Sequence, residues 1–320
     1  MPTRRNAVNN IQQTNIKLKG GKKINWLNII HAAKPEIDYL RENFHFDEKH
    51  LYQSSAKISA LHAAVHHGTD YIFLVLRFPY YDKQEKVIAS EEIDFFVGKN
   101  YVITLHQNKI RALRDFFANY HKINEKQKRN SDSVIDVFYY IVEAIIDSSF
   151  DLLDDIGEIS DEIEDIIFAG ENKNAITVLL NLRRSAINFR SITISYENIF
   201  EKFERLRKEI KINDLRTPFS TIIEKVKDLQ NITENRKEMI EALYATHESI
   251  SNYRLNDIMK TLTIFSVIVF PLTLLAAIFG MNTMNGMPFV NTPQGFWLII
   301  IIMLLGSFGM LMFFKKKKWL

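Results

Sequence analysis

Cysteine is absent from the sequence, which excludes a disulfide framework and a thiolate metal site. A large excess of one charge is also missing, because the net charge is +3 and evenly spread, so a nucleic-acid partner is not indicated. Arg4 and Arg5 precede no apolar stretch, and we expect no signal peptide. A glycine-rich phosphate loop, a catalytic triad order and a metal-hydrolase motif are missing as well. We therefore expect neither an enzyme nor a bound cofactor.

Charged side chains are missing from two long runs near the C-terminus, Leu262 to Phe279 and Phe296 to Phe314. At a rise of about 1.5 Å per residue, each run as a helix is about long enough to cross a hydrocarbon core of ~30 Å. The sequence therefore predicts transmembrane helices over residues 261–282 and 295–314. The lipid bilayer is thus an expected partner.

Basic residues flank these two runs on one side only. Lys260 precedes the first run and Lys315 to Lys318 follow the second, whereas the connecting loop, residues 283–294, carries no charge. The positive-inside rule then places both termini, with the basic tail 315–320, in the cytoplasm and the loop outside.

The first 130 residues have the alternating strand and helix patterns of a cytosolic α/β domain. A buried strand is predicted over Asp70 to Phe78, stopped by Pro79. Two further strands are predicted over Ile93–Val97 and Tyr101–Leu105, joined by Gly98-Lys99-Asn100 as a hairpin. Two helices are predicted over Pro35–Asn43 and Asp47–Ala56.

Residues 131–212 read as an antiparallel helical hairpin without strands. Apolar residues recur there at spacings of three and four, the pattern of a helix-packing seam: Leu152, Ile156, Ile159, Ile163 and Ile166. Gly170-Glu171-Asn172 interrupts the helix, which resumes from Ala175 to about Ile210.

The hairpin is followed by a break at Asn213 to Pro218 and then by a run in which Pro271 is the single strong helix breaker before Gly280. A helix over this run would be about 95 Å long. We expect residues 213–260 to form its cytosolic stalk, which needs packing against the hairpin or against copies of itself. The expected fold class is an α+β domain followed by long helices and two transmembrane helices.

One stripe of the first apolar run contains small, hydroxylated and bulky residues but no charge: Met259, Leu262, Ser266, Phe270, Thr273, Ala277 and Gly280. Small residues in membrane helices commonly serve helix packing. The stripe can equally line a pore shared by several copies, with Phe270 and Leu262 as hydrophobic constrictions. It leads into Gly280-Met281-Asn282, where a neutral amide suits a hydrated cation, and Mg²⁺ sheds its water reluctantly.

The predicted hairpin is acidic, with thirteen Asp and Glu and no Lys or Arg between Asn130 and Asn172. This is either a solvated face, neutralised by the basic segment Lys173 to Lys237, or a surface that attracts cations near a cytosolic mouth. Six crowded acids are candidate weak cation sites: Asp154, Asp155, Glu158, Asp161, Glu162 and Asp165. His62 and His66 would present a Zn²⁺ pair on a helix, but no third ligand is evident, which favours surface histidines.

Three segments of this region resemble the signature of the CorA family of divalent-cation transport proteins: Ile258 to Thr263, Phe270-Pro271-Leu272-Thr273 and Phe279-Gly280-Met281-Asn282. The resemblance implies a funnel-shaped homopentameric Mg²⁺ channel in the bacterial inner membrane, with Co²⁺ or Ni²⁺ tolerated. It places Asn282 in an outer selectivity ring shaped by Gly280 and Met281. It also implies that five positions face the pore, namely Thr273, Phe270, Leu262, Met259 and Asn256. The gate is implied around the last three or four of them.

The chain departs from the family pattern at two places. The outer loop has Met287-Pro288-Phe289-Val290 where relatives have Met-Pro-Glu-Leu, and Thr217 and Ser220 replace sensing aspartates at the start of the stalk. Neutral outer loops also occur in the Zn²⁺-transporting ZntB branch, so a zinc transporter is the alternative. An oligomeric membrane-anchored scaffold is the alternative from another class.

Overall fold

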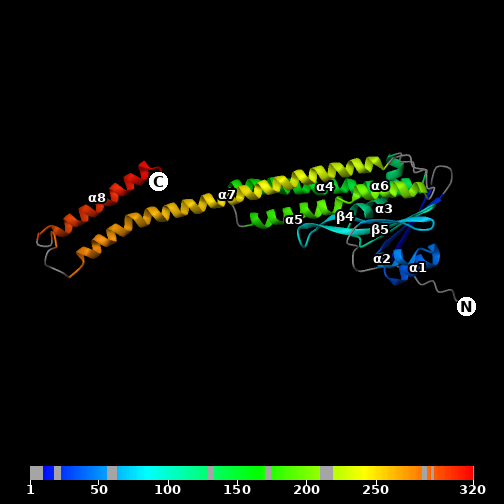
Figure 1. Ribbon diagram of the computed structural model, residues 1–320, viewed down its shortest axis with the longest axis horizontal. Coiled ribbons are helices and arrows are strands. Elements are labelled where there is room, and N and C mark those ends of the chain that lie inside the picture. The colour runs from blue at the N-terminus through cyan, green and yellow to red at the C-terminus, as the bar shows by residue number, and fades with distance from the viewer. Residues whose placement is uncertain are drawn as a thin grey trace. The chain divides into compact units, whose positions relative to one another are not determined.

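The computed structural model describes residues 10–17, 23–55, 63–127, 133–169, 174–209, 219–282, 287–289 and 292–319. The chain divides into two units, Met1–Tyr244 and Ala245–Leu320. The first contains a sheet covered by helices, and the second contains two apolar helices (Figure 1). The expected class, an α+β domain followed by long helices and two apolar helices, is confirmed.

The sheet has six strands in the order β1-β2-β6-β5-β4-β3. Neighbours pair antiparallel except β2 and β6, which are parallel. The strands are β1 (Ile11–Lys17), β2 (Lys23–Ile30), β3 (Ala64–His67), β4 (Tyr71–Asp82), β5 (Val87–Gly98) and β6 (Tyr101–His106).

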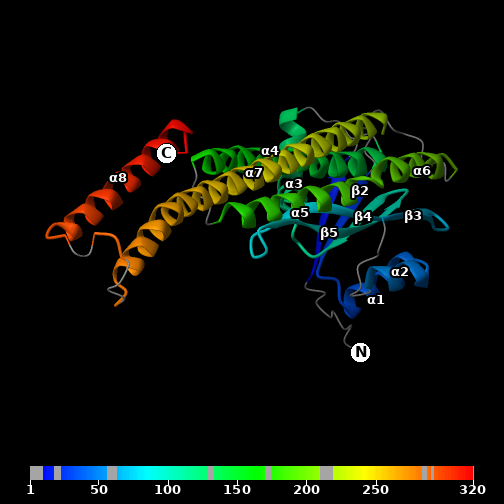
Figure 2. The same ribbon diagram turned by 60° about the vertical axis from the view of Figure 1, so that its left-hand side comes forward.

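Both faces of the sheet are buried, which explains why β4 reads as a continuous apolar run. Phe73 and Val75 face α1 (Lys34–Phe44) and α2 (Glu48–Ser55), whereas Leu74 and Leu76 belong to the larger core on the opposite face. Figure 2 shows α1 and α2 on one side of the sheet and the long helices on the other. The predicted helices in this region are confirmed.

The predicted end of β4 at Pro79 is wrong, because the strand continues to Asp82 with Pro79 opposite Ser90 of β5. The other neighbour, β3, pairs only with residues Ile72 to Val75 of β4. Among the described residues no strand pairs with β4 beyond Val75 on that side, and a residue without an N–H is tolerated at such a position. The predicted β5–β6 hairpin is confirmed, and a Cβ on Gly98 would collide with the Tyr101 ring.

The predicted helical hairpin is also confirmed, as α4 (Val134–Ala169) followed by α5 (Ala175–Thr193). Its seam buries Ile156 and Ile163, whereas Ile166 is exposed. The second arm is interrupted at Ile194 and Ser195, and α6 (Tyr196–Glu209) follows. Thr193 Oγ1 donates to Phe189 O (3.1 Å) in the last turn of α5. With α3 (Arg111–Gln127), these helices cover the sheet.

Helix α7 (Ser220–Phe279) is 60 residues long, or about 90 Å, and continues through Pro271 as predicted. The predicted break at Asn213 to Pro218 lies outside the described residues. At its start, Phe219, Ile222, Val226 and Leu229 are buried in the core of the first unit. The beginning of α7 is therefore packed within its own chain.

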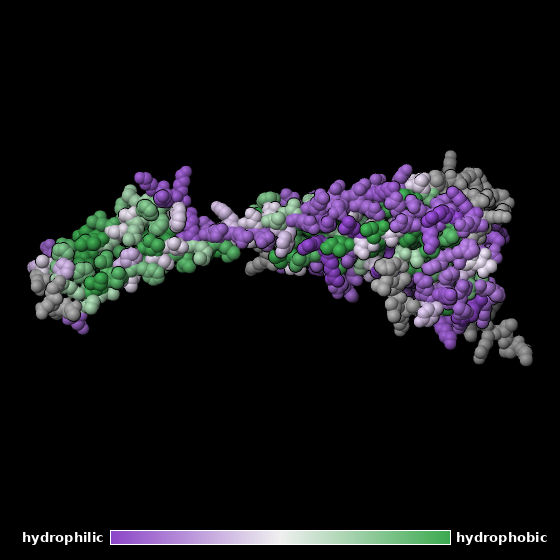
Figure 3. Space-filling view, viewed as in Figure 1, coloured by the Kyte–Doolittle hydropathy of each residue, from purple (hydrophilic) through white to green (hydrophobic). Residues whose placement is uncertain are grey.

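The last part of α7 and helix α8 (Gly295–Lys316) are both long and apolar enough to cross a membrane. Only 6% of the most apolar stretch of α7, and none of that of α8, is buried, so neither is the core helix of a soluble domain. Figure 3 shows hydrophobic residues gathered over these two helices.

Candidate functional site

The predicted stripe occupies one face of α7. At about 100° per residue, its members from Met259 to Gly280, together with Asn256, fall within an arc of about 120° around the helix axis. All of them are exposed except Ser266, which is half-buried. This face is therefore left uncovered by the chain itself.

The opposite face of α7 is the covered one. Its buried or half-buried residues, centred about 180° from the stripe, are Lys260, Ile264, Ile268, Pro271, Leu272, Leu275 and Phe279. Lys260 Nζ donates to Lys318 O (3.5 Å), just beyond the end of α8, so the second helix returns along α7 (Figure 2). The stripe thus points away from the partner helix of its own chain.

The stripe ends where α7 ends. Gly280 N donates to Ala276 O (2.9 Å) and Met281 N to Ile278 O (3.3 Å), which closes the last turn. Asn282 follows directly, with its side chain exposed. A Cβ on Gly280 would lie 3.1 Å from Ala276 O, which is a tight contact. The structure therefore places a neutral amide at the end of the neutral stripe.

The chemistry of the stripe is limited to weak, uncharged ligands. Thr273 Oγ1 already donates to Val269 O (2.9 Å), which leaves its lone pairs available to a water. Since no carboxylate lies on the stripe, it has nothing to replace the inner waters of a dication. It suits an ion that keeps its hydration shell, as Mg²⁺ does.

The six candidate acids on α4 are all exposed and share an arc of about 120°. Among the described residues, no group of three or more His, Asp or Glu is arranged to hold a bare metal ion. Nearer the start of α4, Lys225 Nζ contacts Glu143 (3.1 Å) and Asp147 (2.6 Å). The basic segment therefore neutralises part of the acidic helix.

His66 of the predicted histidine pair is not on a helix. It lies in strand β3, so the helical spacing on which the proposed Zn²⁺ pair depended does not apply to it. His62 lies outside the described residues. The His66 ring instead lies 5.6 Å from that of His50. Burial lowers the pKa of both imidazoles.

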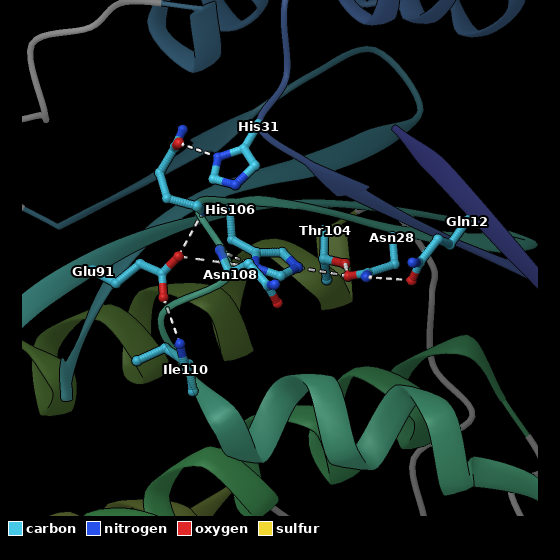
Figure 4. A network of polar contacts seen from close by, with 9 residues as sticks. Gln12, Asn28, His31, Glu91, Thr104, His106, Asn108 and Ile110 are labelled. Carbon is cyan, nitrogen blue, oxygen red and sulfur yellow. Dashed lines mark hydrogen bonds and ion pairs between the residues drawn. The ribbon is translucent and has the colours of Figure 1, made fainter. Parts of the chain in front are cut away.

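Sequence reasoning missed a buried polar network in the sheet (Figure 4). Asn28 Oδ1 accepts from Thr104 Oγ1 and faces His106 Nε2, both at 2.8 Å. Glu91 accepts the backbone N–H groups of Gln107 (2.6 Å) and Ile110 (2.7 Å), just before α3. Burial raises the pKa of Glu91 and lowers that of His106 to about 4. The signal in the sequence that could have revealed this network was the presence of Asn28, Glu91, Thr104 and His106 within otherwise apolar strands.

Comparison with known proteins matches residues 21–316 to the family described as CorA-like Mg²⁺ transporter protein. The cobalt/magnesium transport protein CorA of Thermotoga maritima is 25% identical over 78% of this chain and 71% of its own length. The one from Methanocaldococcus jannaschii is 22% identical over 80% of this chain and 79% of its own length. The complete structure of the CorA magnesium transporter from M. jannaschii superposes with a TM-score of 0.78 at 19% identity, covering 97% and 98% of the two chains.

Proposed function

The chain belongs to the family of CorA-like Mg²⁺ transporter proteins, and we propose on this premise that copies of it form a channel for hydrated Mg²⁺. The observation that carries the proposal is the uncharged stripe of α7, which faces away from α8 and ends at Gly280-Met281-Asn282. Asn282 would recognise the waters of the ion, and Leu262 and Phe270 would narrow the path.

A flux comparison tests the proposal and its alternatives. In proteoliposomes with the same proton gradient applied for each ion, we expect Mg²⁺ to enter faster than Zn²⁺. Co²⁺ and Ni²⁺ should also be transported. The reason is that a neutral path offers no strong ligand to a bare ion and favours one that remains hydrated. Faster Zn²⁺ entry, dependent on the gradient, would identify a zinc transporter. Flux of neither ion would support the membrane-anchored scaffold, which needs no polar stripe.

We further propose a homopentamer in the plasma membrane with both termini inside. Two spans cannot enclose a path, and the uncovered face of α7 requires partners. Lysines flank the start of the first apolar run and the end of the second but not the loop between them, and the positive-inside rule assigns the lysine side to the cytoplasm. Native mass spectrometry in mild detergent is expected to give five chains per particle. A monomer or dimer under conditions that preserve transport would contradict the assembly.

Control of the channel by cytosolic Mg²⁺ is expected to be weak. Thr217 and Ser220 stand where the resemblance implies sensing carboxylates, and hydroxyls bind a hard dication less well. The exposed acids of α4 are the proposed substitute, and as a solvated surface they bind with low affinity. Millimolar Mg²⁺ should therefore increase protease resistance of the first unit only slightly, and converting Asp154, Glu158 and Asp161 to their amides should remove that increase. Strong protection that survives these changes would place the sensor elsewhere.

A further inference from the structure

A cavity of about 560 Å³ is lined by residues of β4, β5 and α5, among them an arginine with an unused donor. Arg77 of β4 is half-buried, and its Nε is buried without a hydrogen-bond partner in the part of the chain that the structure describes. Arg77 Nη2 donates to Ser90 Oγ, which uses one of the two N–H groups on that nitrogen. The Arg77 carbonyl accepts from the hydroxyl of the buried Tyr196, which fixes the backbone here. The guanidinium therefore retains donors for a ligand.

The charge of Arg77 is not balanced within this cavity. None of the described residues that line it is acidic. Glu92 of β5 lies opposite Arg77 in the strand register, but it lines a neighbouring cavity beside His106. Arginine stays charged at physiological pH, so the cavity contains one positive charge without a counter-charge.

The other polar groups of the cavity are neutral, and three of them come from α5 and the turn after it. Asn188, Ser191 and Ser195 follow one another at spacings of three and four, which places them on one side of the helix. Asn188 Nδ2 donates to Ile88 O (2.8 Å), which ties this side of α5 to β5. Ser191 is exposed and Ser195 is half-buried, so a ligand can reach both hydroxyls.

These groups fit an oxyanion, and a phosphate group in particular. The Nε–H and one Nη2–H of an arginine are parallel, so together they donate to two oxygens of one phosphate or carboxylate. The serine hydroxyls add donors for the further oxygens that a phosphate has and a carboxylate lacks. Water can accept the Nε–H bond, but it provides no counter-charge for the guanidinium.

The size and the apolar part of the cavity indicate that the phosphate belongs to an organic molecule. A phosphate group occupies roughly the space of two or three waters, or about 60–90 Å³. Most of the cavity remains for another moiety, and Ile192 and Ile194 provide apolar contacts for it.

We propose that this cavity binds the phosphate group of a small, soluble phosphorylated molecule, held by the Arg77 guanidinium and by the hydroxyls of Ser191 and Ser195. The ligand would connect β4 to the junction of α5 and α6. The site lies in the first unit, whereas the apolar part of α7 and all of α8 belong to the second, which favours a soluble ligand over a lipid headgroup. The proposal goes beyond transport, because the site uses none of the residues of the α7 stripe.

The test uses inorganic phosphate as the probe. It is titrated into the full-length protein in Mg²⁺-free maltoside detergent and followed by ³¹P nuclear magnetic resonance. We expect one saturable site per chain in wild type. Arg77→Gln, which keeps an amide but loses the charge, should bind phosphate at least about tenfold more weakly, because charged hydrogen bonds to the anion are lost.

A charge placed on the cavity wall gives an independent test. Ser191→Asp should weaken phosphate binding by a similar factor, because its carboxylate repels the anion and offers Arg77 an internal partner. Thr177→Asp is the matched control, since it adds the same charge at an exposed position of α5 about 21 Å away along the helix. Thr177→Asp should bind phosphate like wild type.

The absence of a saturable site in wild type would overturn the proposal, and so would equal binding by wild type, Arg77→Gln and Ser191→Asp. Should Arg77→Gln lose its circular dichroism signal, Ser191→Asp decides alone, because Ser191 is exposed and its replacement disturbs no core. Repeating the titration in phosphatidylcholine and phosphatidylglycerol nanodiscs should give the same affinity. Weaker binding in phosphatidylglycerol would identify a lipid headgroup as the occupant and overturn the soluble ligand. Asn282→Ala should retain the site, so a failure of the transport proposal is distinguishable from a failure here.

Discussion

Replacing Asn282 by alanine is expected to abolish Mg²⁺ uptake while leaving the assembly intact. The amide is exposed at the end of α7, so its removal creates no cavity and exposes no core. It is also the polar side chain that follows the last turn of the stripe, where an ion would first exchange bulk water for protein contacts. In the proposed assembly five amides disappear together, so the loss should exceed roughly a hundredfold, because each lost hydrogen bond to the waters of the ion costs about 0.5–1.5 kcal/mol.

The measurement is Mg²⁺ uptake into proteoliposomes, with native mass spectrometry of the same preparation. Gln294→Ala is the matched control, because Gln294 is an exposed amide just before α8 and makes no capping hydrogen bond. It should transport like wild type. Wild-type uptake by the Asn282 variant would remove Asn282 from the ion path.

The largest expected loss of stability comes from Phe138→Ala. Phe138 of α4 is fully buried, with its ring centroid 5.2 Å from Phe95 of β5, 4.9 Å from Phe203 of α6 and 5.8 Å from Phe219 before α7. Removing it leaves a cavity where four elements meet and should cost about 3–5 kcal/mol. The thermal midpoint of the first unit should fall by roughly 10 °C.

Phe168→Ala on the same helix is the control, because that ring is 64% exposed. Its free energy of unfolding should stay within about 0.5 kcal/mol of that of wild type, so its thermal midpoint should hardly change. Differential scanning calorimetry of both variants in the same detergent compares them directly. Equal losses for the two positions would mean that the aromatic cluster around Phe138 does not hold the helices on the sheet.

Features with a local signal were predicted well from the sequence. The apolar runs predicted the two long exposed helices. The spacing of three and four predicted that Ile156 and Ile163 of α4 are buried. The same periodicity gave the stripe of α7, but the stripe alone could not say which face α8 covers. That required the contact between Lys260 and Lys318, which are 58 residues apart.

The errors arose where distant segments decide local structure. Pro79 continues β4 where, among the described residues, β3 no longer pairs with it, and nothing near Pro79 in the sequence reveals how far β3 reaches. The polar network joins Asn28 to His106 across 78 residues, so neither residue alone indicated a partner.

The position of α7 across both units also has a consequence for biosynthesis. The first unit is complete at Tyr244, and 35 more residues must be added before the apolar part of α7 ends at Phe279. At about 5–20 residues per second, the ribosome needs roughly 2–7 s for this stretch. A sheet of this topology can fold within that interval. The nascent chain can therefore hold a folded sheet before its first membrane helix is complete.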